Sequence, residues 1–233
     1  MMAKHYLGCL LALPMLGFAS AQAEPVGDET FEGSLVCAAP AGRPDAGSIS
    51  CRAQINPGVP EIALSLVLQG GDANGGRVLD RIEFRHTGET EPFQVLKGIA
   101  LQVPDGTENG GVELLDVNFD GFFDLRVRRS GAEGEALYQN WVWSKEGGNF
   151  VAIPELDAIV SPVFNAEDQE IVSRWKHGAN ERESDIYSFD GSIPLLVHRE
   201  VDRLSDSGAC QRIFYDRIDD ELRKTGTGPC DKE

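Results

Sequence analysis

Residues 61–85 read EIALSLVLQGGDANGGRVLDRIEFR, and this stretch decides the fold class. Apolar residues alternate with other residues over Glu61–Leu68 and again over Val78–Arg85, a pattern typical of half-buried β-strands. Between the two segments, Gly70-Gly71-Asp72 and Asn74-Gly75-Gly76 are turn signals. The stretch is therefore predicted to form two strands joined by a turn.

The same short alternating pattern continues along the chain. Further strands are predicted at residues 93–96, 123–128, 137–143, 171–175, 186–189, 193–201 and 212–217. Frequent Gly, Asn and Asp turns leave no room for long helices, apart from one helical turn near Glu155–Ile159. We expect one all-β domain over residues 24–233, a single antiparallel meander that is propeller-like or sandwich-like, with a loop-rich N-terminal part at 24–60.

Composition limits the classes of function. The chain has 233 residues, with 38 acidic against 21 basic side chains and a formal net charge of -17. This length is enough to bury one core. A surface this negative repels nucleic-acid phosphates and anionic lipids, so cations and basic proteins are the expected partners.

The first 23 residues are typical of a secretory signal peptide. Lys4 lies in a short polar segment, Tyr6–Phe18 is apolar but too short to span a bilayer, and Ala21-Gln22-Ala23 ends in small residues. We expect cleavage before Glu24, which leaves 20 basic and 38 acidic residues and a net charge of -18. No later segment has transmembrane length, so a periplasmic or secreted location without membrane insertion is predicted.

The cysteines agree with an oxidising compartment. Cys9 lies in the signal peptide, and four cysteines remain, an even number that allows three pairings. Proximity favours Cys37 with Cys51 and Cys210 with Cys230, each of which would restrict the unfolded chain by roughly 3 kcal/mol. The alternative is a metal site, but the spacing lacks the close cysteine pair of a zinc site.

One motif carries specific chemistry, DVNFDGFFD at residues 116–124. Oxygen-bearing side chains at positions 1, 3, 5 and 9 of the motif, with glycine at position 6, form the front of a calcium loop. The predicted Ca²⁺ ligands are the side chains of Asp116, Asn118, Asp120 and Asp124 and the backbone carbonyl of Phe122.

The motif is not an EF-hand. Its twelfth position is Val127 instead of a bidentate Glu, and both flanks have strand patterns, so the loop is expected to join two strands. Affinity on the order of 10⁻⁵ to 10⁻³ M is expected for such a site. The alternative is a hairpin whose Asp and Asn side chains make Asx turns and bind no ion.

The loop resembles the calcium loops of FG-GAP and VCBS-type repeats. The ordered residues that follow it, from Tyr138, Trp141 and Trp143 to Tyr187-Ser188-Phe189-Asp190-Gly191, are similar to a family of periplasmic β-propeller-like proteins with a single such loop. That family includes an immunity protein against a lysozyme-like effector of an antibacterial type IV secretion system. The resemblance covers roughly residues 112–200.

The resemblance implies a non-catalytic function. It implies inhibition of a lysozyme-like hydrolase, and it suggests Ser130, Gly131 and Tyr138 as partner-binding residues, although these lie further apart than in exported lysozyme inhibitors. The described immunity protein is a lipoprotein, whereas this signal peptide is predicted to be cut after Ala23. A cell-envelope carbohydrate-binding or adhesive module is the alternative function.

Other residues favour structural roles. Trp141, Trp143, Phe150 and Tyr138 are predicted to fill the core instead of stacking on sugars. The three histidines that follow the signal lack metal-ligand spacing, and the acidic residues at 216–221 are typical of a solvated turn. No nucleophile elbow, phosphate loop or Cys-His signature is present, so the protein is not expected to be an enzyme.

Overall fold

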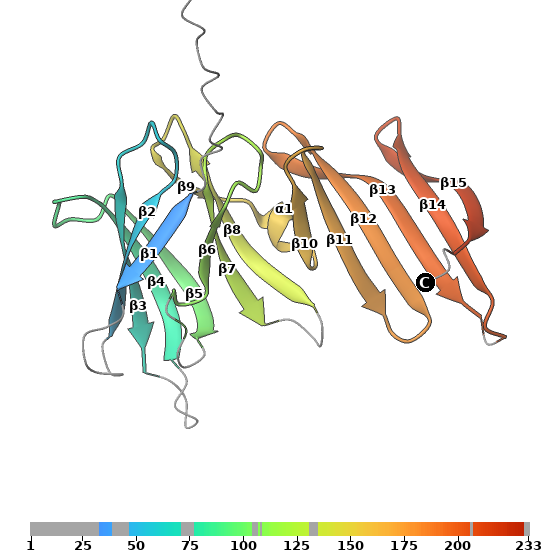
Figure 1. Ribbon diagram of the computed structural model, residues 1–233, viewed down its shortest axis with the longest axis horizontal. Coiled ribbons are helices and arrows are strands. Elements are labelled where there is room, and N and C mark those ends of the chain that lie inside the picture. Colours follow the sequence, from blue (N-terminus) through green and yellow to red (C-terminus); the bar gives the residue numbers. More distant parts are fainter. Residues whose placement is uncertain are drawn as a thin grey trace, which may run out of the picture. The chain divides into compact units, whose positions relative to one another are not determined.

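The computed structural model describes residues 33–38, 47–70, 77–103, 107, 109–130, 135–205 and 207–230. The predicted signal peptide, its cleavage point and most of the loop after Ala38 lie outside the described residues. The described chain is all-β apart from one short helix, as predicted, and its strands form three antiparallel sheets (Figure 1).

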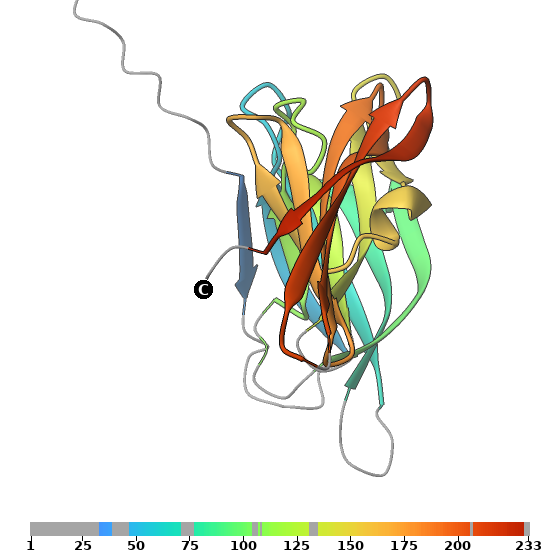
Figure 2. The same ribbon diagram turned by 90° about the vertical axis from the view of Figure 1, so that its right-hand side faces the viewer.

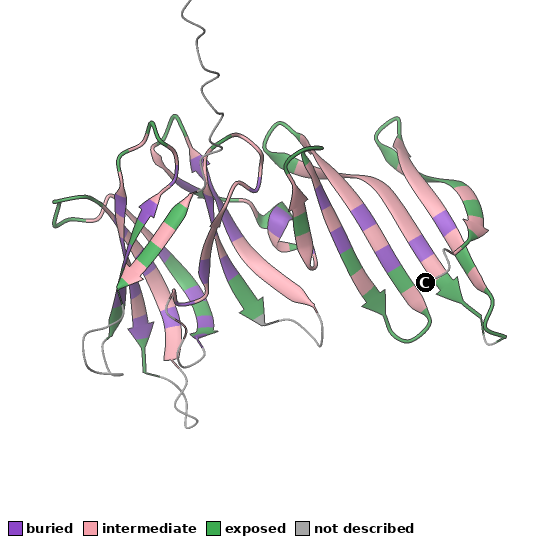
Figure 3. Ribbon diagram, viewed as in Figure 1, coloured by how far each residue is buried: buried purple, intermediate pink, exposed green. Residues whose placement is uncertain are grey.

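The first sheet is a meander of five consecutive strands in the order β1-β2-β3-β4-β5. The strands are β1 (Ser34–Ala38), β2 (Ser48–Gln54), β3 (Ile62–Gln69), β4 (Arg77–His86) and β5 (Gln94–Val103). Buried and partly exposed residues alternate along β3, as its sequence pattern predicts (Figure 3). The pattern did not predict β1 and β2, which lie within the part expected to be rich in loops.

The second sheet has four consecutive strands in the order β6-β7-β8-β9. They are β6 (Val112–Leu115), β7 (Asp124–Ser130), β8 (Ala136–Ser144) and β9 (Asn149–Ala152). A short helix follows, α1 (Pro154–Asp157), at the site of the predicted helical turn. This sheet shares one hydrophobic core with the first, where Leu125, Trp141 and Trp143 pack with Leu66 and Phe84.

The third sheet contains six consecutive strands, and its last hairpin faces the viewer in Figure 2. The strands are β10 (Pro162–Asn165), β11 (Glu170–His177), β12 (Glu181–Asp190), β13 (Ile193–Leu204), β14 (Cys210–Ile218) and β15 (Glu221–Pro229). A second, smaller core joins this sheet to α1 and the second sheet through Ile171, Leu156 and Val142. The sequence pattern did not predict β9, β10 and β15.

Both predicted disulfides are present. Cys37 and Cys51 face each other across β1 and β2, and Cys210 is bonded to Cys230 beyond the end of β15. Each disulfide therefore closes a pair of antiparallel strands that the alternating pattern alone did not predict in full. Within the described residues, no helix is long and apolar enough to cross a membrane.

Ion pairs take the place of apolar packing in the middle of the third sheet. Arg199 donates two hydrogen bonds of 2.7 Å to the carboxylate of Asp185 and lies 2.8 Å from Glu183. Both acids are buried, and burial raises the pKa of Glu183 while Arg199 opposes that rise. The guanidinium thus compensates two carboxylates on one face of β12.

A charged pair on the other face of this sheet makes stability depend on pH. His198 Nδ1 lies 2.7 Å from Asp216, its Nε2 lies 3.5 Å from Glu200, and Thr225 donates to the same Asp216 carboxylate. Burial alone lowers the pKa of His198, but the hydrogen bonds with Asp216 and Glu200 outweigh it, and the pKa is raised. Hydrogen bonds from Thr225 and His198 lower the pKa of Asp216.

Because the pKa of His198 is raised in the folded protein, this pair stabilises the fold more at low pH than at high pH. The stabilisation is fully present below the unfolded pKa of about 6.5 and is lost as the pH rises through the higher folded value. We expect His198→Gln to lower Tm by roughly 2–4 °C more at pH 5 than at pH 8. The control variant is His86→Gln, because the ring of His86 stacks on Phe93 and is not paired with the carboxylate of any described residue. Equal losses at both pH values would contradict the prediction.

Candidate metal centre

The predicted calcium loop is the connection between β6 and β7. Leu115 at the end of β6 pairs with Asp124 at the start of β7, so the loop joins two antiparallel strands as expected. Two residues in it have left-handed backbone conformations, Phe119 with φ 60° and Gly121 with φ 81°. The turn therefore favours glycine at position 6, because residues with a Cβ atom rarely adopt this conformation.

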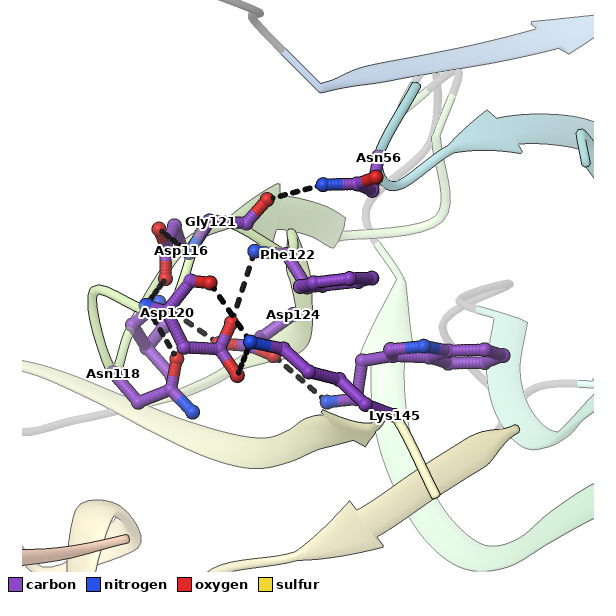
Figure 4. Close-up of polar contacts among 10 residues, drawn as sticks. Asn56, Asp116, Asn118, Asp120, Gly121, Phe122, Asp124 and Lys145 are labelled. Atoms are coloured by element: carbon purple, nitrogen blue, oxygen red, sulfur yellow. Dashed lines mark hydrogen bonds and ion pairs between the residues drawn. The ribbon is translucent and has the colours of Figure 1, made fainter. Parts of the chain in front are cut away.

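Carboxylate and amide oxygens of the loop point inward at its own backbone (Figure 4). The Asp116 carboxylate accepts hydrogen bonds from the backbone N–H groups of Asp120 (3.0 Å) and Gly121 (2.9 Å). The Asp120 carboxylate accepts one from Phe122 (2.9 Å), and Asn118 Oδ1 accepts one from Asp120 (3.3 Å). These Asx-type bonds hold the side-chain oxygens of positions 1, 3 and 5 on the inside of the turn.

Asp124 is the buried member of the set. It is fully buried, and its two carboxylate oxygens accept hydrogen bonds from the backbone N–H groups of Val117 (2.9 Å) and Trp143 (2.8 Å). Burial raises the pKa of Asp124 to about 8, against the effect of these two bonds, and the charges of Asp120 and Asp116 add to the rise. Burial also raises the pKa of Asp116. The charges of Asp116 and Asp120 therefore disfavour the ionised form of Asp124.

One basic side chain lies against the loop. Lys145, in the turn after β8, places Nζ 3.6 Å from the Asp120 carboxylate and donates a 3.1 Å hydrogen bond to the Asp120 carbonyl oxygen. The same ammonium group lies 4.5 Å from the centre of the Phe122 ring. Its single charge compensates only part of the charge of three aspartates. Nothing in the sequence around the motif indicated Lys145, which lies 25 residues from Asp120.

The first sheet also anchors the loop. Asn56 Nδ2 donates a 2.8 Å hydrogen bond to the carbonyl oxygen of Gly121, and the N–H of Phe123 donates one of 2.8 Å to the carbonyl of Ile55. Sequence reasoning missed both contacts, because Ile55 and Asn56 follow β2 and carry no recognisable motif. The loop is consequently held from two sheets, by Asn56 on one side and Trp143 on the other.

The donor set of this loop fits a hard cation. All side-chain donors at positions 1, 3, 5 and 9 are oxygens, and no sulfur or nitrogen ligand is among the predicted residues, which suits calcium and excludes thiophilic metals. In the described part of the chain, the carboxylate oxygens of Asp116, Asp120 and Asp124 do not all lie within 4.8 Å of one another. The carboxylates would therefore have to move closer together around an ion. Asp116, Asn118 and Asp120 would hold it from the turn, with Asp124 below them.

Two of the three predicted partner-binding residues, Ser130 and Tyr138, lie within the described residues, on the paired strands β7 and β8. Ser130 is the last residue of β7, and Gly131 lies outside the described residues. Tyr138 lies in β8, where its half-buried ring contacts the guanidinium of Arg126 at 4.1 Å. Tyr138 is therefore engaged within the second sheet.

Three of the four aromatic residues predicted to fill the core do so. Trp141, Trp143 and Phe150 are 3–6% exposed, and Trp143 meets Phe150 edge to face at 5.1 Å. Their faces are covered by protein atoms of the first two sheets and are not presented for stacking on sugar rings. Tyr138 is only partly buried, so it is the exception in this set.

The histidines remain poor candidates for metal ligands. Within the described ranges, His177 does lie close to Glu181 and Glu183, with ligand atoms within 4.8 Å of one another. Both carboxylates are already paired, Glu181 with Arg203 (2.8 Å) and Glu183 with Arg199 (2.8 Å). A cation would have to compete with two guanidinium groups there.

No family model and no curated protein matches this chain. Its fold matches that of a solved Xanthomonas protein related to a type IV secretion system, with a TM-score of 0.60. The match covers 82% of this chain and 98% of that one at 18% sequence identity. The two chains share a fold. A second match, to a Bacteroides fragilis protein of unknown function, has a TM-score of 0.26 at 5% identity over 70% of this chain and 91% of that one.

Proposed function

We propose that this protein is an exported, calcium-binding and non-catalytic inhibitor of a lysozyme-like peptidoglycan hydrolase, acting as an immunity protein. The observation that carries the proposal is the fold shared with the Xanthomonas protein related to a type IV secretion system, over nearly the whole of that chain. The order of motifs from the calcium loop to Gly191 supports it independently, since it resembles a family that contains such an immunity protein.

Electrostatics favours a basic partner. The chain from Glu24 onward carries a net charge of -18, and the loop accounts for only three of its 38 acidic residues. A surface of this charge steers a cationic enzyme toward it and accelerates association, with a strong dependence on salt. A lysozyme-like hydrolase with a net positive charge would be a partner of this kind.

Calcium would have a structural role in this function. When bound, the ion would compensate the negative charge of the three loop aspartates. Asp116, Asn118 and Asp120 orient the turn, while Asp124 holds the turn against β8 through Val117 and Trp143. A loop ordered before docking lowers the entropic cost of association.

The carbohydrate-binding alternative has less support. It relies on exposed aromatic side chains, and Trp141, Trp143 and Phe150 are all buried. It predicts retention on peptidoglycan or glycans with no effect on hydrolase activity, which separates it from the proposed function in one assay.

The assay is lysis of bacterial cell walls by a panel of lysozyme-type hydrolases, including any secreted hydrolase encoded next to this gene. With the mature protein in excess, we expect the rate of lysis by its cognate enzyme to fall at least tenfold in calcium, with weaker inhibition at high salt. Asp120→Asn should inhibit less well, whereas Asp190→Asn, the same charge change at the exposed end of β12, should inhibit fully. Undiminished lysis with every hydrolase would overturn the proposal.

A further inference from the structure

Lys145 reaches the calcium loop from a neighbouring hairpin. It follows Ser144, the last residue of β8, and lies in the turn that leads to β9. Two hydrogen bonds close this turn, from the N–H of Gly147 to Ser144 Oγ (3.0 Å) and from the N–H of Gly148 to the Ser144 carbonyl oxygen (2.8 Å). The backbone at Lys145 is therefore positioned by the β8–β9 hairpin and not by the calcium loop itself.

The same end of β8 contacts two of the predicted calcium ligands. The backbone N–H of Trp143 donates a hydrogen bond to Asp124, and Lys145, two residues further along, lies beside the carboxylate of Asp120. Asp124 is fully buried, whereas the side chain of Asp120 is 27% exposed and that of Lys145 is 50% exposed. The positive charge of Lys145 thus acts on the more accessible of the two carboxylates.

Both oxygens of the Asp120 carboxylate are engaged in the structure (Figure 4). Oδ1 accepts the hydrogen bond from the N–H of Phe122 (2.9 Å), and Oδ2 lies 3.6 Å from Lys145 Nζ. The same ammonium group donates to the Asp120 carbonyl oxygen at 3.1 Å and lies 4.5 Å from the centre of the Phe122 ring. Three attractive contacts therefore hold a cation against a carboxylate that is also a predicted calcium ligand.

We propose that Lys145 is a positioning residue that holds the Asp120 carboxylate in place without calcium and lowers the affinity of the loop for the ion. An ammonium group and a divalent cation repel each other, so the pair with Lys145 opposes binding of calcium to the same carboxylate. The inference rests on the calcium-binding part of the proposed function and adds its regulation. With Lys145 present, the loop would bind calcium only at the high concentrations typical of extracellular modules.

The test is calorimetric titration of the mature, disulfide-bonded protein with calcium chloride at low salt. Lys145→Met keeps an unbranched apolar side chain beside Phe122 and removes the charge, so its calcium affinity should rise by about fivefold or more. Lys145→Arg keeps the charge and should bind calcium as the wild type does. The matched control is Lys224→Met, which removes an exposed positive charge from β15 and should leave the affinity unchanged. A lysine that only supported the fold of the loop would give the opposite result, because its removal would weaken calcium binding.

Thermal unfolding supplies a second measurement on the same variants. In excess chelator, Lys145→Met should lower Tm by roughly 1–3 °C relative to Lys224→Met, because Asp120 loses its counter-charge. At saturating calcium this difference should disappear or reverse, since the variant binds the ion more tightly. The two measurements together separate the effect of Lys145 on the loop from its effect on the ion.

The outcomes distinguish this inference from the proposed function. Equal or weaker calcium affinity in Lys145→Met would overturn the inference and leave calcium binding by the wild type intact. Absence of binding in both the wild type and Lys145→Met would overturn the inference together with the metal part of the proposed function. Binding by Lys145→Met alone would support the inference. Inhibition of a hydrolase is measured separately, by the lysis assay.

Discussion

Replacing Asp124 with alanine is expected to lower the free energy of unfolding by about 2–6 kcal/mol. The carboxylate is fully buried and is the acceptor for the backbone N–H groups of Val117 and Trp143, and both of these residues are buried as well. Removing it leaves two donors without partners where water has little access, at a cost of about 1–3 kcal/mol each. Urea unfolding followed by tryptophan fluorescence would measure this, since Trp141 and Trp143 become exposed.

The measurement should be made in excess chelator, so that loss of calcium cannot contribute. Asp190→Ala is the control for removing an aspartate, because Asp190 is exposed and should change stability by less than about 0.5 kcal/mol. The Asp124→Asn variant should also be less stable than the wild type. Its amide nitrogen cannot accept a hydrogen bond, so one of the two N–H groups loses its acceptor. A loss below about 1 kcal/mol for Asp124→Ala would show that these two bonds do not hold the loop on β8.

Calcium is expected to stabilise the wild type by about 1.4 to 4 kcal/mol at about 10 mM ion. This range follows from an affinity on the order of 10⁻⁵ to 10⁻³ M and from exclusive binding to the folded state. The physical reason is that the ion neutralises the mutual repulsion of Asp116, Asp120 and Asp124, which Lys145 offsets only in part. The measurement is Tm with calcium and with chelator.

Variants at the loop separate ion binding from turn formation. Asp120→Ala should lose most of the calcium-dependent rise in Tm, whereas Asp190→Ala should retain it. Magnesium should act more weakly than calcium, because it requires a smaller and more regular shell of oxygens. If calcium leaves the Tm of the wild type unchanged, the loop is a turn held by Asx-type hydrogen bonds, and the metal part of the proposed function is wrong.

The fold was predictable where apolar residues alternate with polar ones. Strands β3, β4 and β8 follow that pattern and were predicted close to their observed bounds. In β15, Gly226 and Gly228 interrupt a polar sequence, so nothing local indicates a strand. It forms because its backbone pairs with β14 and because Cys230 is bonded to Cys210. Pairing with a neighbour, and not local preference, decides such strands.

The sequence predicted the loop at residues 116–124, but not the residues from other strands that contact this loop. The spacing of Asp116, Asn118, Asp120 and Gly121 indicated an inward-facing loop, and the structure has that loop. Lys145 and Asn56 contact it from other strands, and no property of their neighbours in the sequence identified them. Contacts of this kind depend on which strands are brought together.

The sequence by itself determined the all-β class, the two disulfide pairs and the calcium-type loop, because each depends on residues close together along the chain. Only the tertiary structure decided that Asp124 is buried and accepts a hydrogen bond from the backbone of Trp143, and that Arg212 pairs with Asp202 on the neighbouring strand. The alternation of a strand fixes which side chains share a face. The strand that lies beside it, and hence the charge and water around each side chain, follows from packing the three sheets.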